Sequence, residues 1–425
     1  MKIKVKKGLD IPLTGAPSGE VKKLSLPPLL ALDLSPFEMT PFKLLKKEGE
    51  AVKVGEPIAL DKNCSERLFV SPASGKISKL ARGLKRRILS IVIETDGKQT
   101  PFETKGKTVF EAGLSPHICA RPGLGIAHPK RAPEAIFVKA IESAPFAPPP
   151  ELQVQGFEVF FQEGIQVLKE FAPVHLVCRE NDSYFSKIDA NIHTATGPHP
   201  AGNPSVHIAA VHPITRNDQV VWTLNIIDVI TLGRWKLEGV YHTERVISVG
   251  GEDSPGYYQV FSGFPMKELF KDEESRIISG DLLMGSAVGM EGFLGFYHRS
   301  ACSIKEREEK REMFHFLKLK RKGFTASKAY FFRKKAMELS TLLHGEERAF
   351  VDGGIYDRVM PLEVETMPLI KMLLTKDYER GREMGLLGVH PEDFALPTFI
   401  CPSKIEMTEI VKEGLSEYVK EYLEF

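Results

Sequence analysis

The chain has few cysteines and almost no net charge, and each shortage excludes a class of protein. Its five cysteines lie far apart and form no CxxC pair. A disulfide framework or a cysteine-rich metal site is therefore not expected, and a reducing compartment is favoured. The formal net charge is +1, so no field of the whole molecule attracts nucleic acid or an acidic partner.

Long hydrophobic runs are also missing. The most apolar stretch, 277–297, contains Asp281, Glu291 and several glycines, whereas a membrane span needs about 20 mostly apolar residues. The first eight residues carry charge but no apolar signal region. We therefore expect no transmembrane segment and a chain that stays in the compartment where it is made.

Motifs of common hydrolases are absent as well. The sequence contains neither HExxH nor a GxSxG elbow, and no Ser-His-Asp arrangement is recognisable. A zinc peptidase or a serine hydrolase therefore has no support.

What is present is the composition of an ordinary globular protein, with 42% hydrophobic and 27% charged residues. The length of 425 residues suggests several domains. We place a small β module at 1–103, a Rossmann-like α/β domain at 104–255, a β-grasp-like (SLBB-type) module at 256–325 and a helical domain at 326–425. The predicted fold class is thus multidomain α/β and α+β.

The β module shows short alternating segments separated by glycine. An EGxxVxxGxxI pattern begins at Glu48 and an SPxxGxI pattern at Ser71, and together they resemble the biotinyl/lipoyl domain, a barrel-sandwich hybrid. Lys62 stands near the position of the modified lysine in such domains. The flanking residues are polar, however, so we interpret Lys62 as an ordinary exposed turn residue, and an intact mass would reveal an adduct.

Two strand-helix-strand patterns follow. The first has strands at 135–140 and 174–178 around an amphipathic stretch at 156–171, and a further helix is expected between 104 and 143. The second has strands at 220–224 and 245–249 around a helix at 226–236. Together they predict one Rossmann-like sheet, whose strand ends commonly bind ligands.

Between these units lies an unusual stretch, 197–213, with four prolines and three histidines. Proline fixes φ and removes a backbone donor, so we expect a structured loop, neither helix nor long strand. His199, His207 and His212, with His193 upstream, could bind a metal. Their spacing matches no metal motif, so histidines that satisfy loop carbonyls are the favoured interpretation.

Two further motifs resemble incomplete cofactor sites. Glycines 123 and 125 could cradle a phosphate, but prolines interrupt both sides and no complete GxGxxG follows a strand. Cys401-Pro402 resembles the end of an iron–sulfur run. The other cysteines of such a run are missing, so neither a nucleotide nor a cluster is predicted.

A basic and aromatic patch marks the start of the helical part. Three interpretations remain open: a solvated helix face, a surface facing anionic lipid or an acidic partner, and a site for single-stranded nucleic acid. Its basic residues include Lys320, Arg321, Lys322 and Arg333, among Phe324, Tyr330, Phe331 and Phe332.

Motifs spread over the whole chain carry a resemblance to a known family. They are KKGLDIP from Lys6, SPASG from Ser71, GPHPAG from Gly197, RIISG from Arg276, GEERA from Gly345, YDRVMP from Tyr356 and FICPSK from Phe399. The sequence resembles the NqrA family of the Na⁺-translocating NADH:quinone reductases.

The resemblance implies a peripheral subunit on the cytoplasmic face of the bacterial inner membrane, in a six-subunit complex. That complex uses NADH, flavins, iron–sulfur and ubiquinone and exports Na⁺. The resemblance also implies that this chain binds no cofactor of its own. The broken glycine loop and Cys401 would then be remnants of cofactor sites that related flavin-binding proteins retain.

Quinone binding is a further implication of the resemblance. An apolar cleft with one or two donors would suit quinone, and His199 or His207 beside Gly202 and Trp222 is the candidate site; the membrane subunits are the alternative location. A different class of function also stays open. The chain would then be a lipoyl-like carrier or scaffold without a role in electron transfer.

Overall fold

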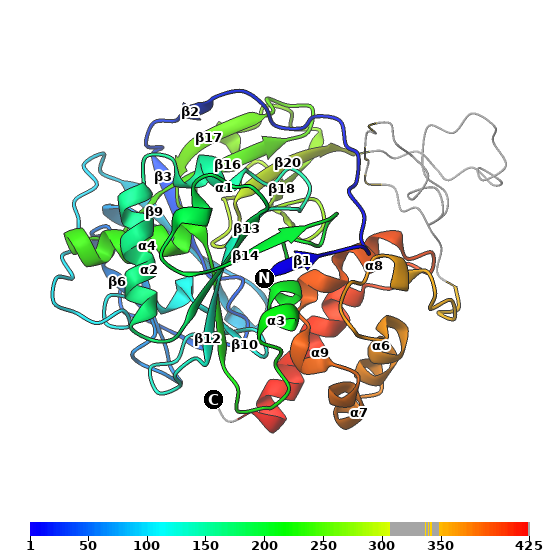
Figure 1. Cartoon of the computed structure of the whole chain (residues 1–425). Helices are drawn as coiled ribbons and strands as arrows, with labels where there is room; N and C mark the ends of the chain where they lie inside the picture. The colour runs from blue at the N-terminus through cyan, green and yellow to red at the C-terminus, as the bar shows by residue number, and fades with distance from the viewer. Residues whose placement is uncertain (307–335, 337–338, 340, 342–347, 424–425) are drawn as a thin grey trace.

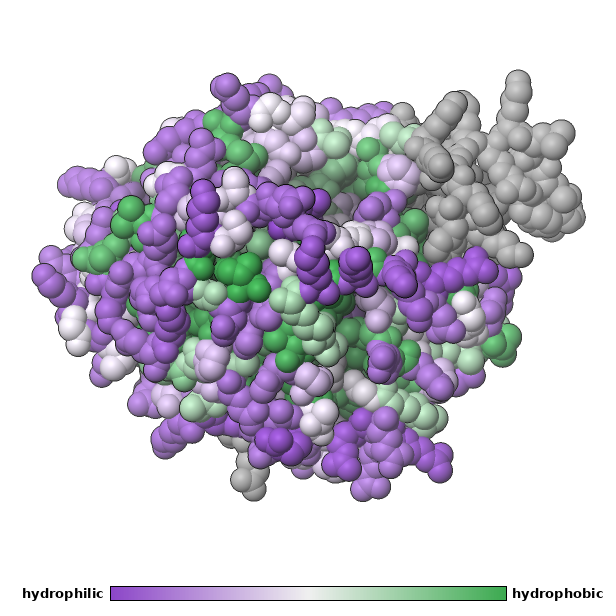
Figure 2. Space-filling view, viewed as in Figure 1, coloured by the Kyte–Doolittle hydropathy of each residue, from purple (hydrophilic) through white to green (hydrophobic). Residues whose placement is uncertain are grey.

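The computed structural model describes residues 1–306, 336, 339, 341 and 348–423, and strands in this part of the chain form four sheets beside a group of helices (Figure 1). Hydrophilic residues cover much of the face seen in Figure 2, with hydrophobic residues interspersed toward its middle. None of the described helices combines the length and the apolar character needed to cross a bilayer.

Two small antiparallel sheets form the first module, in the orders β3-β9-β8-β5 and β4-β6-β7. Their strands are β3 (Leu29–Asp33), β4 (Phe42–Leu44), β5 (Ala51–Val52), β6 (Pro57–Asp61), β7 (Leu68–Val70), β8 (Gly75–Arg82) and β9 (Ile88–Thr95). Alternate apolar side chains from both sheets, such as Ile58 and Ile91, pack into one core. Gly75 is required in the SPASG turn because a Cβ there would lie 1.9 Å from the carbonyl oxygen of Glu94.

A seven-stranded sheet follows, in the order β1-β14-β13-β12-β15-β10-β11. Its strands are β1 (Lys2–Lys4), β10 (Cys119–Arg121), β11 (Gly125–Ile126), β12 (Ala135–Ala140), β13 (Val174–Arg179), β14 (Asn191–Thr196) and β15 (Val221–Asn225). The first five in the sheet order are parallel, and β10 and β11 are antiparallel to their neighbours. The first predicted strand-helix-strand unit is therefore confirmed.

Helices cover both faces of this sheet. On one face lie α2 (Glu158–Lys169) and α4 (Ile226–Glu238), with the short α1 (Pro150–Val154) nearby. The backbones of the two long helices are in close contact at Gly164. A Cβ on this residue would lie 2.0 Å from the carbonyl oxygen of Val229, so only glycine fits there. On the other face lies α3 (Pro204–Val211), which shares its core with the C-terminal helices.

The expectation that 197–213 contains no helix is wrong, because α3 lies inside it. Pro204 occupies the first helical turn, where its missing N–H would have no intrahelical acceptor. Pro213 comes after the helix end. The helix expected between 104 and 143 does not form either, since that segment contains turns, the 3₁₀ turn η2 (Ser115–His117) and strands.

A six-stranded sheet has the order β19-β18-β20-β16-β17-β2. Its strands are β2 (Val21–Lys23), β16 (Glu244–Gly250), β17 (Gly256–Phe261), β18 (Ser275–Ser279), β19 (Ser286–Ala287) and β20 (Ser300–Lys305). The strand predicted at 245–249 is thus real but does not complete a second unit in the α/β sheet. Strand β16 is buried along most of its length. The sequence of a buried strand does not show which of the two sheets the strand joins.

The N-terminal segment connects several parts of the molecule. Strand β1 extends the seven-stranded sheet and β2 extends the six-stranded sheet. Between them, the Gly8 N–H donates to the Arg358 carbonyl at 2.9 Å and the Leu9 N–H to the His199 carbonyl at 2.8 Å. Strands β1 and β2 therefore pair with strands that lie beyond the predicted domain boundary at residue 103.

The described C-terminal residues are helical. They form α6 (Thr366–Leu374), α7 (Tyr378–Glu383), α8 (Ala395–Ile400) and α9 (Met407–Tyr422), with 3₁₀ turns such as η8 (Pro391–Phe394) between them. Their apolar side chains pack with α3 and with the first strand. The predicted patch of Lys320, Arg321, Lys322 and Arg333 lies outside the described residues.

Candidate functional site

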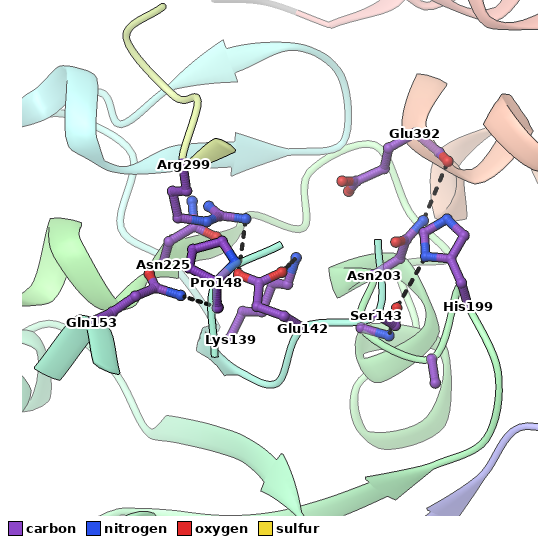
Figure 3. Close-up of polar contacts among 12 residues, drawn as sticks. Lys139, Glu142, Ser143, Pro148, Gln153, His199, Asn203, Asn225, Arg299 and Glu392 are labelled. Atoms are coloured by element: carbon purple, nitrogen blue, oxygen red, sulfur yellow. Dashed lines mark hydrogen bonds and ion pairs between the residues drawn. The ribbon is translucent and has the colours of Figure 1, made fainter. Parts of the chain in front are cut away.

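Parallel strands place polar side chains at one edge of the seven-stranded sheet. Strands β12, β14 and β15 all end there, and the loops that follow carry Glu142, Ser143, His199 and Asn203 (Figure 3). In open α/β sheets, ligands bind outside the carboxyl ends of the strands. This edge is therefore the candidate functional site.

His199 is fixed at this edge by two hydrogen bonds, and the side chain that binds its ring is itself held in place. Its backbone N–H donates to Asp10 Oδ1 at 2.9 Å, and its Nδ1 lies 3.0 Å from Ser143 Oγ, which accepts from the Gly202 N–H at 2.8 Å. Gly202 is needed because a Cβ would lie 2.8 Å from that Oγ. Burial lowers the pKa of His199 to about 4, so the imidazole is neutral near neutral pH.

His207 has a structural role, as expected. It is 1% exposed within α3, and its Nε2 donates to the Ala201 carbonyl at 2.8 Å. Burial lowers its pKa to about 4. The imidazole thus closes the loop that begins the helix.

Trp222 does not share a cleft with these histidines, and the grouping predicted from the sequence is wrong. Its ring lies 5.2 Å from that of Phe171 and packs with α2 and α4, while the adjacent Val221 packs on the face that carries α3. Neighbouring residues of a strand point to opposite faces. The tryptophan therefore belongs to the core on the far side of the sheet.

The other two histidines of the metal hypothesis are also separated. His193 Nε2 lies 3.0 Å from Nδ1 of His175, and His212 Nε2 lies 3.2 Å from Glu134 Oε2. Among the residues that the structure describes, no group of three or more His, Cys, Asp or Glu side chains is placed to hold a metal ion.

A buried ion network crosses from the α/β sheet to the six-stranded sheet (Figure 3). Lys139 Nζ lies 2.9 Å from Glu142 Oε2, and Arg299 Nη2 lies 3.0 Å from Glu142 Oε1. Burial alone would raise the pKa of Glu142, but Arg299 and Lys139 outweigh it and hold that pKa below its usual range. The network joins the two sheets with a charged carboxylate.

A second polar cluster joins the same edge to the C-terminal helices. Arg121 donates to Ser205 Oγ at 2.9 Å and to Glu392 Oε1 at 2.8 Å, and Asn203 Nδ2 donates to Asp393 Oδ1 at 3.0 Å. The two carboxylates lie at the N-terminus of α3, where helix N–H groups favour negative charge. The chain thus supplies its own anions at this position.

These carboxylates titrate differently. Burial and the neighbouring Glu392 raise the pKa of Asp393 to about 6. For Glu392, burial opposes ionisation, but Arg121 and His390 outweigh it and lower the pKa to about 2. Negative charge is therefore concentrated on the residue that contacts Arg121.

The glycine-bearing loop at 121–129 is a β-hairpin, since β10 and β11 pair as antiparallel strands on either side of Gly123. A phosphate cradle of the dinucleotide type needs a helix directly after the glycines, and β11 stands there instead. A Cβ on Gly123, which has φ +94°, would lie 2.6 Å from Val419 Cγ2 in α9. The glycine therefore serves helix packing.

Cys401 and Lys62 also take ordinary structural positions. Cys401 is buried, with its Sγ 3.2 Å from the Tyr356 hydroxyl and 3.4 Å from the donating Ile405 N–H. Lys62 is an exposed residue just after β6. Its side chain lies on the surface, as expected for a turn lysine.

One buried cluster had no signal in the sequence. His117 places Nδ1 2.7 Å from Asp228 Oδ1 and Nε2 2.7 Å from the Tyr241 hydroxyl. Burial raises the pKa of Tyr241 above its usual value. The three residues are too far apart in the chain for spacing to reveal them, and they tie η2 to α4.

Comparison with known proteins gives the family. The model of the NqrA N-terminal barrel-sandwich hybrid domain matches residues 3–96, and that of the NqrA second alpha/beta domain matches residues 103–241. The NqrA chain of the Na(+)-translocating NADH-quinone reductase from Chlamydia pneumoniae is 36% identical, covering 99% of this chain and 98% of its own. The chain belongs to the NqrA family.

Other relatives agree with this membership. The NqrA chains of Klebsiella pneumoniae (strain 342) and of Yersinia pestis bv. Antiqua (strain Angola) are each 32% identical over 99% of this chain and 100% of their own. The predicted resemblance is therefore confirmed from end to end. The barrel-sandwich hybrid is confirmed for the N-terminal module, and the second domain is an α/β domain.

Proposed function

We propose that this chain is the NqrA component of a Na⁺-translocating NADH:quinone reductase, placed peripherally on the cytoplasmic face of the membrane. The observation that carries this proposal is the similarity to NqrA proteins of such reductases over 99% of the chain. In the proposed complex of six subunits, NADH is oxidised, ubiquinone is reduced and Na⁺ is exported. Flavins and iron–sulfur groups belong to the other subunits.

The proposal includes that this chain holds no redox cofactor. Three local structures support it. The glycine loop is a hairpin packed on α9, the N-terminus of α3 faces Glu392 and Asp393, and Cys401 is enclosed beside Tyr356. In each case neighbouring protein groups pack directly against the motif.

Affinity purification from solubilised membranes tests the function. A tagged chain is expected to retain a flavoprotein complex with Na⁺-stimulated NADH:quinone reductase activity, while the chain purified alone shows no flavin absorbance. Purification without such a complex would favour the alternative, a lipoyl-like carrier or scaffold. Mass measurement of the same sample checks whether Lys62 carries an adduct.

A contribution to quinone binding is a second candidate, now centred on His199 and Gly202 without Trp222. The Gly202 N–H donates to Ser143 Oγ, so the serine hydroxyl can point at His199 Nδ1 and leave the imidazole proton on Nε2. A neutral imidazole of this kind can donate to a quinone carbonyl. Equal affinity of a quinone analogue for the wild type and His199→Ala would remove His199 from the proposed site.

A further inference from the structure

The hairpin between β8 and β9 ends in an apex that is unlike the rest of the surface. Leu84 is 93% exposed there, the largest exposure of any large hydrophobic residue among those described. Isolated exposed leucines are common on protein surfaces. The backbone and the charges around this one distinguish it.

The backbone of the apex is held in a costly conformation. Lys85 has φ 53° and Arg86 has φ 61°, and the Arg87 N–H donates to the Leu84 carbonyl at 3.1 Å. A two-residue hairpin turn with positive φ at both positions normally uses Asn-Gly or a similar pair. Lysine and arginine are strained in this turn, and strain of this kind gathers at functional positions.

The apex also carries uncompensated positive charge. Arg82, Lys85 and Arg86 are exposed, and no ion pair links any of them to an acidic side chain of the described chain. Arg87 lies 3.8 Å from Glu38, but Lys412 Nζ lies closer to that carboxylate, at 2.9 Å. The hairpin therefore presents an apolar side chain surrounded by cations.

We propose that this apex, Arg82–Arg87, docks on an acidic surface of another protein of the complex, with Leu84 entering an apolar socket. The inference rests on the proposed function. Exposed cations steer association with an acidic patch. A leucine held on a fixed turn contributes affinity when its side chain leaves water and is buried in an apolar pocket of the partner.

The fixed turn favours a protein partner over the other anionic surfaces. A bilayer adapts to any backbone, so it gives no advantage to a strained turn. Single-stranded nucleic acid is bound by stacking on aromatic side chains, and the apex contains none. A socket of defined shape, in contrast, selects one conformation of the hairpin.

The test uses the complex retained by the tagged full-length chain, washed at increasing salt, with bound flavin as the readout. Leu84→Asp and Lys85→Asn/Arg86→Gly are expected to retain about tenfold less flavin at moderate salt, as for the loss of a few contacts at an interface. The Asn-Gly variant is also expected to melt at a higher temperature, because its residues suit the turn. Its lost retention therefore cannot arise from misfolding.

Two controls sharpen the comparison. Lys85→Arg/Arg86→Lys keeps both charges and should retain flavin like the wild type. Val159→Asp changes an exposed apolar residue on α2, outside this hairpin, and should do the same. Retention by the Asn-Gly variant equal to that of the wild type would overturn the docking proposal alone.

Other outcomes separate the alternatives. A wild-type chain that retains no flavoprotein contradicts the proposed function and the docking partner together. Salt-sensitive binding of the isolated chain to phosphatidylglycerol vesicles, lost in Leu84→Asp, would overturn the protein partner in favour of a lipid surface.

Discussion

Four histidines, in different parts of the molecule, are uncharged near neutral pH because they are buried. Burial lowers the pKa of His199 and His207 to about 4 and that of His242 and His390 to about 3. A neutral imidazole can donate from one nitrogen and accept at the other. His199 and His207 therefore act as neutral hydrogen-bonding groups, and acid should disrupt them.

The contribution of His207 can be isolated with His207→Gln, which can still donate to the Ala201 carbonyl. The folded-state pKa of about 4 lies below the ordinary histidine pKa of 6.5. Its stabilising effect is therefore complete above pH 6.5 and is lost as pH falls toward 4, up to roughly 3 kcal/mol. Urea unfolding from pH 7.5 to 4.5 should show a shallower loss of stability in the variant. An unchanged pH dependence would contradict this assignment.

At the scale of single elements, the hairpin around Gly123 depends on contact with α9. Gly123→Ala should lower the free energy of unfolding by about 2 kcal/mol, because φ is +94° and the new Cβ meets Val419 Cγ2. Adding Val419→Ala should recover the steric part of this cost. Gly97→Ala is the matched control, since Gly97 has φ +74° and nothing within 4 Å.

The measurement is chemical denaturation of the three variants and of Val419→Ala. If Gly123→Ala and Gly97→Ala lose equal stability, the contact with α9 contributes nothing and only the backbone conformation matters. Costs that simply add in the double variant would lead to the same conclusion.

Local sequence patterns predicted the helices and strands better than they predicted which elements pair or pack with one another. The amphipathic stretch at 156–171 became α2, because its periodicity reports which side of a helix is buried. The run at 135–140 became β12, because a short apolar run favours a strand that is buried on both faces. Helix α3 was missed because its prolines were counted as breakers, although Pro204 stands where helices accept proline. The sheet joined by β16 depends on pairing that no local pattern contains.

In the candidate site, too, some features could be predicted from the sequence and others could not. Its location beyond the ends of parallel strands and the structural role of His207 followed from the sequence. The roles of Glu392 and Asp393 did not, because they come from a distant helical segment that folds onto α3. The predicted inclusion of Trp222 failed because sequence distance does not reveal the face of a sheet.

At the scale of the whole molecule, the C-terminal helices are attached to the α/β domain through Arg121. Its side chain is 8% exposed and that of its partner Glu392 is 26% exposed. Arg121→Met should cost about 3 kcal/mol, because it leaves Glu392 and Asp393 without their cation. Thermal unfolding and limited proteolysis of the C-terminal helices would measure the effect.

Neutralising the acids should reverse much of that loss. Arg121→Met combined with Glu392→Gln and Asp393→Asn is expected to be more stable than Arg121→Met alone, since no buried charge is left unpaired. A triple variant as unstable as the single one would show that the arginine acts through packing.

The pairing of β1 has a consequence for how the protein is made. Residues 2–4 join the sheet only by lying beside residues 194–196, so on the ribosome the first strand must wait, unpaired, until the middle of the chain has emerged. Domains otherwise fold in order of synthesis, at about 5–20 residues per second. The first strand can therefore join its sheet only once residues 194–196 have emerged, so a lysine-rich segment stays unpaired for roughly ten seconds or more during synthesis.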